Sequence, residues 1–107
     1  GYLMKTADDP TRLYEYIDSQ DWTNAIRQAE KQPDEVETWI EKRNGFVYTC
    51  VLPIHAAITL NAPVTVVETL LAVYPEGAEK KDAAGNLPIH LAANGYDLDD
   101  DVIDILL

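Results

Sequence analysis

The chain contains nearly the same seven-residue stretch twice. Residues 52–58 read LPIHAAI, and residues 87–93 read LPIHLAA, 35 positions further on. The similarity continues beyond these stretches, because residues 65–71 align with residues 101–107 at an offset of 36. Self-similarity with a period in the thirties is typical of repeat proteins, in which each unit buries its apolar face against the next. The sequence therefore predicts stacked copies of one small unit.

Each unit is expected to contain two short helices. Pro53 and Pro88 are expected to open the first helix, because proline lacks an N–H group that would have no intrahelical partner there. The second helix carries apolar residues at i, i+1, i+4 and i+5, the spacing of one buried stripe. These residues are Val66, Val67, Leu70 and Leu71 in one unit and Val102, Ile103, Leu106 and Leu107 in the other. Asn61 and the pair Asn94-Gly95 lie where the first helices should end.

A β-hairpin is expected before the first of these units. Residues 38–43 and 46–51 are two β-prone runs on either side of Asn44-Gly45, a pair that favours a tight hairpin turn. A two-residue turn at Asn44-Gly45 would place Trp39 opposite Cys50. We call this hairpin the first finger.

The segment at the same place in the next unit, residues 80–86, is shorter. Asp82 and Gly85 have the spacing of a β-turn, so we expect a tighter second finger.

The N-terminal third is expected to form a capping helical hairpin. Residues 11–20 place Leu13, Tyr14 and Ile17 on one face, with Asp9 or Thr11 near the N-cap, and a second helix is expected over residues 23–31. The remaining face of that second helix is polar, as terminal repeats require. The predicted organisation is one domain over residues 1–107, with a cap at about 11–37, the first finger at 38–51, one unit at 52–79 and another at 80–107. Because the last residues are apolar, we expect further repeats or another subunit to cover that edge.

The charge of the chain limits its partners. Nineteen acidic and eight basic residues give a net charge of −11, which argues against binding to nucleic acid or to anionic lipid. No apolar run approaches the roughly 18 residues of a membrane span. The single cysteine, Cys50, permits no internal disulfide. This favours an intracellular protein, although the compartment stays unknown.

The motif as a whole resembles the ankyrin repeat. Leu-Pro-Ile-His-Leu-Ala-Ala at residues 87–93, preceded by residues 82–85 (DAAG) and followed by Asn94-Gly95 and a Val-Ile-x-Ile-Leu-Leu helix, is similar to the family hallmark T-P-L-H-x-A within a unit of about 33 residues. Leu52 and Leu87 stand where the family has a threonine that caps the helix. The capping bond must therefore come from another group or from water. The resemblance implies an all-α solenoid of stacked helix-turn-helix units with β-hairpin fingers.

The resemblance also implies which residues bind and which are structural. Ankyrin domains usually bind proteins through their finger tips and through the concave face of their first helices. The residues that this implies are Lys42, Arg43, Asn44, Gly45 and Tyr48 in the first finger and Lys81, Asp82, Ala84, Gly85 and Asn86 in the second. Structural roles are implied for Pro53, His55, Pro88 and His90, with each histidine tying a neighbouring loop to its helix. Trp22 and Trp39 are expected to pack rather than to anchor a partner.

Catalytic and metal-binding hypotheses are weaker than the structural ones. Cys50 and His55 are residue types that can act as a nucleophile and a base, but no orienting acid or oxyanion donor accompanies them. Asp97, Asp99 and Asp101 have the spacing of the first ligands of a calcium loop, but the central glycine and the glutamate at position twelve are missing. The plainer interpretation of this acidic run is a helix N-terminus. We therefore expect no catalytic, cofactor or metal site.

The sequence thus predicts a non-catalytic module for protein interaction or scaffolding, whose protein partner it does not identify. The alternative is a regulatory or targeting segment of a larger enzyme or assembly.

Overall fold

The computed structural model consists mostly of short helices. It describes residues 6–7, 11–44, 46–93 and 100–106; the side chains of residues 6–7, 42–44, 47–48 and 100–101 fall outside that description. The described residues form seven α-helices: α1 (Arg12–Asp18), α2 (Trp22–Lys31), α3 (Pro33–Val36), α4 (Pro53–Thr59), α5 (Val64–Val73), α6 (Pro88–Ala93) and α7 (Asp100–Leu106). A 3₁₀ helix, η1 (Pro75–Glu79), follows α5.

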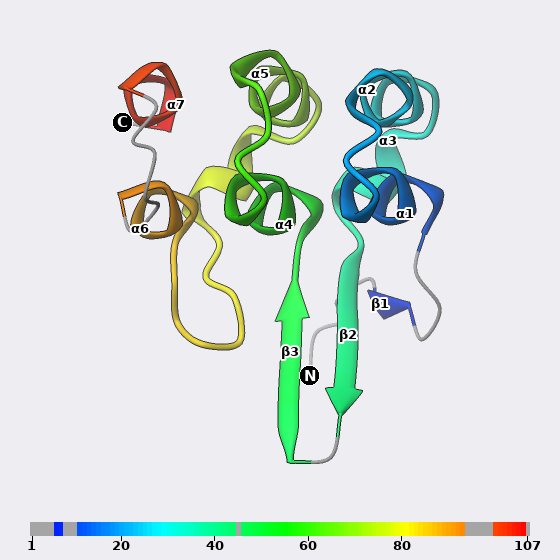
Figure 1. Ribbon diagram of the computed structural model, residues 1–107, viewed down its shortest axis with the longest axis vertical. Coiled ribbons are helices and arrows are strands. Elements are labelled where there is room, and N and C mark those ends of the chain that lie inside the picture. The colour runs from blue at the N-terminus through cyan, green and yellow to red at the C-terminus, as the bar shows by residue number, and fades with distance from the viewer. Residues whose placement is uncertain (1–5, 8–10, 45, 94–99, 107) are drawn as a thin grey trace.

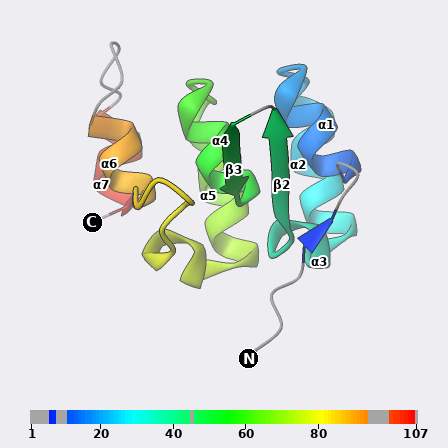
Figure 2. The same cartoon turned by 90° about the horizontal axis from the view of Figure 1, so that it is seen from below.

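The helices lie in two rows. One row contains α1, α4 and α6, and the other contains α2, α5 and α7 (Figure 1). The view from below shows the pairs α1–α2, α4–α5 and α6–α7 side by side (Figure 2). The two α-helices of each pair are consecutive in the chain.

Most of the core lies between the two rows. Its buried members are Leu13, Ile17, Ala25, Ala29, Val36, Leu52, Ile54, Ala57, Ile58, Ala62, Val66, Val67, Leu70 and Val102. The expected stripe of α5 is therefore buried at Val66, Val67 and Leu70, whereas Leu71 is half-buried. Trp22 and Trp39 pack against this core, as predicted.

The strands form a small sheet on the side of the α1–α4–α6 row. Strands β2 (Trp39–Asn44) and β3 (Val47–Val51) are antiparallel and extend away from the helices (Figure 1). A two-residue strand, β1 (Thr6–Ala7), pairs in parallel with the start of β2. The hairpin was predicted, whereas β1 was not.

The helix termini follow local sequence signals. Thr11 caps α1 by accepting a hydrogen bond from the Tyr14 backbone N–H at 3.1 Å, and Asp21 does the same for α2. Gln20 and Asn61 follow α1 and α4 with left-handed φ angles of 61° and 58°. The next residue after each donates its N–H to a carbonyl five positions back, a closing turn common at helix ends.

Two short elements were not predicted. Pro33 follows α2 and opens α3. Pro75 follows α5 and opens η1. In both places proline occupies the first helical turn, where its missing N–H costs no hydrogen bond.

Among the described helices, none is long and apolar enough to cross a membrane.

Candidate functional site

The first finger is the β2–β3 hairpin, and its register differs from the prediction. Glu41 pairs with Cys50, and the last pair joins Asn44 to Val47. The expected pairing of Trp39 with Cys50 is therefore wrong by two residues. A shift of two keeps every residue on its predicted side of the sheet, because side chains alternate with a period of two. Cys50 is buried, as expected of a small apolar residue.

The second finger is a tight turn organised by Asp82. Its Oδ1 atom accepts hydrogen bonds from the backbone N–H groups of Ala84 at 3.0 Å and Asn86 at 2.8 Å. The Gly85 N–H donates to the Asp82 carbonyl at 2.9 Å, and Gly85 has a φ of 85°, which favours glycine. This is the tighter finger that the Asp82 and Gly85 spacing predicts.

Two hydrogen bonds fix the second finger to the rest of the domain. The Ala83 N–H donates to the Cys50 carbonyl of β3 at 3.0 Å. His55 Nε2 donates to the Lys80 carbonyl at 2.8 Å. The first of these bonds joins the turn of the second finger to β3, the second joins the start of that finger to α4, and both fingers project from the same side of the helices (Figure 1).

His55 connects three parts of the fold. Its Nδ1 atom accepts a hydrogen bond from the Leu52 N–H at 3.0 Å, so Nε2 carries the proton that is donated to Lys80. The ring is fully buried and lies 5.8 Å from the Trp39 ring, at 34° to it. Burial lowers the pKa of His55 below its ordinary value, and this outweighs the opposite effects of the Lys80 carbonyl and Asp82. The imidazole is therefore neutral and structural.

His55 makes one of the two hydrogen bonds of a capping box, but not the one that a threonine side chain at position 52 would make. In the usual capping box the third helical residue reaches back to the backbone N–H of the N-cap residue. His55 occupies that third position of α4, and its Nδ1 atom accepts a hydrogen bond from the backbone N–H of the N-cap residue Leu52. The His55 N–H, which a threonine hydroxyl would accept, donates instead to the Leu52 carbonyl at 3.0 Å, so a backbone group replaces the missing side-chain cap.

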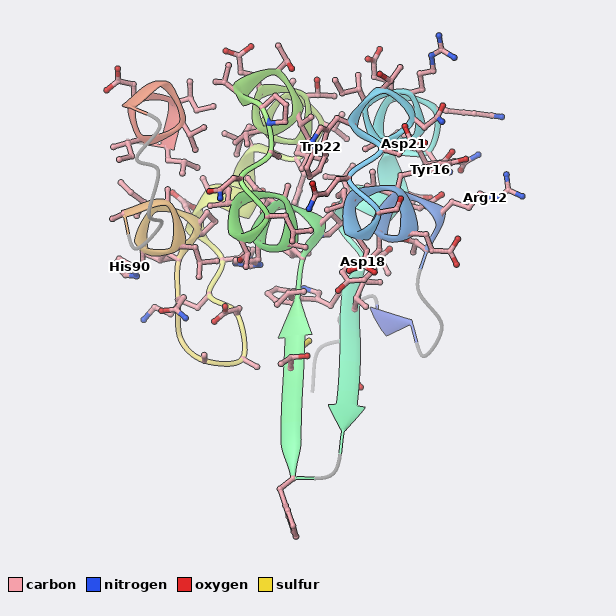
Figure 3. All side chains as sticks on the ribbon, in the orientation of Figure 1. Arg12, Tyr16, Asp18, Asp21, Trp22 and His90 are labelled. Carbon is pink, nitrogen blue, oxygen red and sulfur yellow. The ribbon has the colours of Figure 1, made fainter. Side chains whose placement is uncertain are left out.

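His90 repeats half of this arrangement. Its Nδ1 atom accepts from the Leu87 N–H at 3.2 Å, but its ring is exposed. Within the part of the chain that the structure describes, its Nε2 atom has no hydrogen-bond partner. Figure 3 shows His90 on α6, at the end of the domain opposite Arg12.

The predicted binding residues occupy both fingers. In the second finger Lys81, Ala84 and Gly85 are exposed, whereas Asp82 and Asn86 are half-buried. In the first finger, Lys42, Arg43 and Asn44 belong to β2 and Tyr48 to β3, but their side chains lie outside the described part. Gly45 lies outside it entirely.

One candidate residue was missed. Phe46 is fully exposed, beside the last pair of the hairpin. An aromatic residue directly after Asn44-Gly45 was the available signal. The prediction placed it in a β-prone run. In the structure the strand pairing ends at Asn44 and Val47, and Phe46 lies in the turn that connects them.

The geometry offers no support for metal binding in the described region. Among the residues that the structure describes, no three histidine, cysteine, aspartate or glutamate side chains are grouped to hold a metal ion. Asp97 and Asp99, which motivated the calcium alternative, lie outside the described residues, as does the Asn94-Gly95 turn. Asp101 belongs to the N-terminal turn of α7.

Comparison of the chain with protein-family models, with curated proteins and with solved structures found no match. The case for a function therefore depends on the residues and their arrangement.

Proposed function

We propose that this chain is an ankyrin-type repeat module that binds another protein through its two finger tips and the adjoining row of first helices. In this proposal it is a non-catalytic interaction or scaffold domain.

The observation that carries the proposal is the pair of projections that are fixed side by side. The hairpin and the residue 80–86 turn extend from the same side of the helices (Figure 1); the Ala83–Cys50 hydrogen bond joins them, and the His55–Lys80 hydrogen bond fixes the second to α4. A surface that is ordered before binding loses less conformational entropy when a partner arrives. The arrangement therefore suits recognition more than it suits catalysis.

The arrangement of the helices supports the repeat interpretation. Similar sequences, LPIHAAI and LPIHLAA, contribute α4 and α6 to neighbouring positions in one row. The α5 and α7 helices that follow them occupy neighbouring positions in the other row (Figure 2). This is the order expected if the chain stacks one helical hairpin upon the next.

Affinity capture from the lysate of the source cell tests the proposal. The bait is the intact chain, compared with a finger variant in which Lys42, Arg43 and Lys81 are replaced by glutamate. We expect at least one protein to bind the parent chain and to be lost from the finger variant.

A matched control variant separates a specific effect from a general change of charge. Arg12, Arg27 and Lys31 are exposed cations on α1 and α2, and their replacement by glutamate lowers the net charge by the same amount. The control variant should keep the captured partner. Equal loss from both variants would reduce the interaction to bulk charge, and the absence of any partner would contradict a standalone binding module.

A further inference from the structure

We infer that the outer edge of β3 binds a short, extended, acidic segment of a partner protein, with an apolar side chain of that segment packed on Phe46. This inference rests on the proposed function, because it specifies the chemistry of the partner for the same finger.

The first argument is the position of β3 in the sheet. Among the strands that the structure describes, the order is β1, β2, β3, so β3 is an edge strand of this sheet. Its outer edge already accepts one backbone hydrogen bond, from the Ala83 N–H to the Cys50 carbonyl. Backbone groups two residues apart in a strand point to the same edge, so the N–H and C=O of Tyr48 face outward as well. The free end of the hairpin extends further from the helices than the residue 80–86 turn does (Figure 1).

The second argument is the composition of the edge. Residues 46–51 read FVYTCV, which are β-prone and contain no charge, proline or glycine. Edge strands usually carry such residues to prevent pairing with another chain. Phe46 is fully exposed, and it is the one exposed large apolar side chain among the described residues. An unprotected edge beside an exposed aromatic ring is suited to strand addition.

The third argument is local charge. The first finger, residues 38–51, contains Lys42, Arg43 and Glu41, a net charge of +1, whereas the rest of the chain carries a net charge of −12. Charges interact mainly within about 8 Å at physiological ionic strength, so a ligand at the projecting finger is influenced chiefly by the finger. An acidic segment is favoured at this place.

Two other occupants fit the edge less well. A second copy paired through β3 would carry the same Lys42 and Arg43 and would therefore add no charge complementarity. A lipid surface would leave the backbone groups of the edge unpaired in an apolar medium and would approach the acidic body. A peptide strand satisfies the edge and complements the charge.

Selection of peptides from a display library tests the inference. The intact chain is used as bait for random twelve-residue peptides, and the enriched peptides are synthesised and titrated by fluorescence anisotropy. We expect them to be rich in Asp and Glu, interspersed with β-branched or aromatic residues. Phe46→Ala should weaken binding about fivefold, and replacing Lys42 and Arg43 by glutamate should weaken it at least tenfold. The matched pair of glutamate replacements at Arg12 and Arg27 should change it less than twofold.

Backbone methylation of the peptide tests strand addition directly and does not perturb the protein. Methylating the N–H groups of every second residue removes the donors on one edge of an extended peptide. One alternate set should lower affinity at least tenfold, and the other set should change it less than threefold. Tyr48→Pro, which removes an outward N–H of β3, should abolish binding while leaving the helical circular dichroism signal intact.

Several outcomes would overturn the inference. These are a lack of enriched peptides, binding that is insensitive to the finger variants, equal effects of both methylated sets, self-association that depends on Phe46, or Phe46-dependent binding to phosphatidylserine vesicles. If affinity capture still yields a finger-dependent protein partner in such a case, the proposed function stands and only the strand-addition mode fails. If capture yields no partner but acidic peptides bind as described, the edge site stands alone.

Discussion

Replacing His55 by alanine should destabilise the domain far more than the same change at His90. Without its ring, the Leu52 N–H loses its acceptor and the Lys80 carbonyl loses its donor. An unpaired buried polar group costs about 1–3 kcal/mol. We take about 2 kcal/mol for the fully buried Leu52 and about 1 kcal/mol for the half-buried Lys80, whose carbonyl can regain water.

The lost packing adds to this cost. The imidazole is fully buried beside Trp39, and truncating a buried ring leaves a cavity, for which about 1–2 kcal/mol is reasonable. The total of about 4–5 kcal/mol is a large part of the 5–15 kcal/mol by which domains of this kind are usually stable. At His90 one local hydrogen bond of 3.2 Å is lost from an exposed ring, and the expected cost is below about 1 kcal/mol.

Urea denaturation followed by tryptophan fluorescence measures both variants. We expect the midpoint of His55→Ala to fall well below that of His90→Ala, with unchanged slopes, because the slope reports the surface exposed on unfolding. If the unfolding free energies of the two variants differed by less than about 1 kcal/mol, the hydrogen bond from His55 to Lys80 would contribute little to stability, which would contradict this prediction.

Four further predictions concern the protonation of His55, left-handed backbone positions and one side-chain hydrogen bond. Because burial lowers the pKa of His55, the unfolded chain takes up a proton at this histidine at higher pH than the folded domain does. The free energy of unfolding should therefore fall as the pH decreases below about 6.5. The unfolding free energies of the parent and of His55→Ala, measured in urea, should approach each other over that range. Gln20→Gly should stabilise the domain by about 0.5–1 kcal/mol by relieving its left-handed φ, and Asn61→Gly should gain less because asparagine tolerates that region; thermal melts would show the difference. Gly85→Ala should cost about 1 kcal/mol in the same melts, because its φ is 85° and no neighbouring atom would collide with the added carbon. Glu35→Ala should cost about 1 kcal/mol in urea, since its carboxylate accepts the N–H of the second residue of α1 at 2.9 Å.

The sequence predicted the longer helices because their signals are local, although it did not predict α3 and η1. Pro53 and Pro88 mark the first turns of α4 and α6, and the spacing of Val66, Val67 and Leu70 identifies the buried side of α5. The motif also indicated a structural role for histidine. Each of these features depends on a few residues that are close together in the sequence, so a local sequence pattern is enough to predict it.

The hairpin register illustrates where such signals fail. The predicted and observed pairings differ by two residues, and both place Trp39, Glu41 and Cys50 on one side of the sheet. The alternation of apolar residues therefore cannot distinguish them, and the choice depends on turn geometry alone. Because the prediction centred the turn on Asn44-Gly45, it placed Phe46 in the ladder and overlooked the exposed side chain.

The pairing of β1 was beyond sequence reasoning for a different reason. Thr6 and Ala7 pair with Trp39 and Ile40, more than thirty positions away, and two residues carry no measurable alternation. The contact is formed because the start of β2 offers a free edge beside the core. Such contacts depend on the assembled fold rather than on local preference.

The two copies of the histidine motif show how a repeated sequence can have unequal effects. Both histidines accept the N–H of the preceding leucine, a bond that the local sequence determines twice. The second bond requires a carbonyl from a later segment, and Lys80 supplies it to His55. That one contact also positions the residue 80–86 turn beside β3, where Ala83 reaches Cys50. A substitution at His55 should therefore disturb the relative placement of the two fingers as well as stability, so a loss of binding in His55→Ala has to be interpreted together with its melting curve.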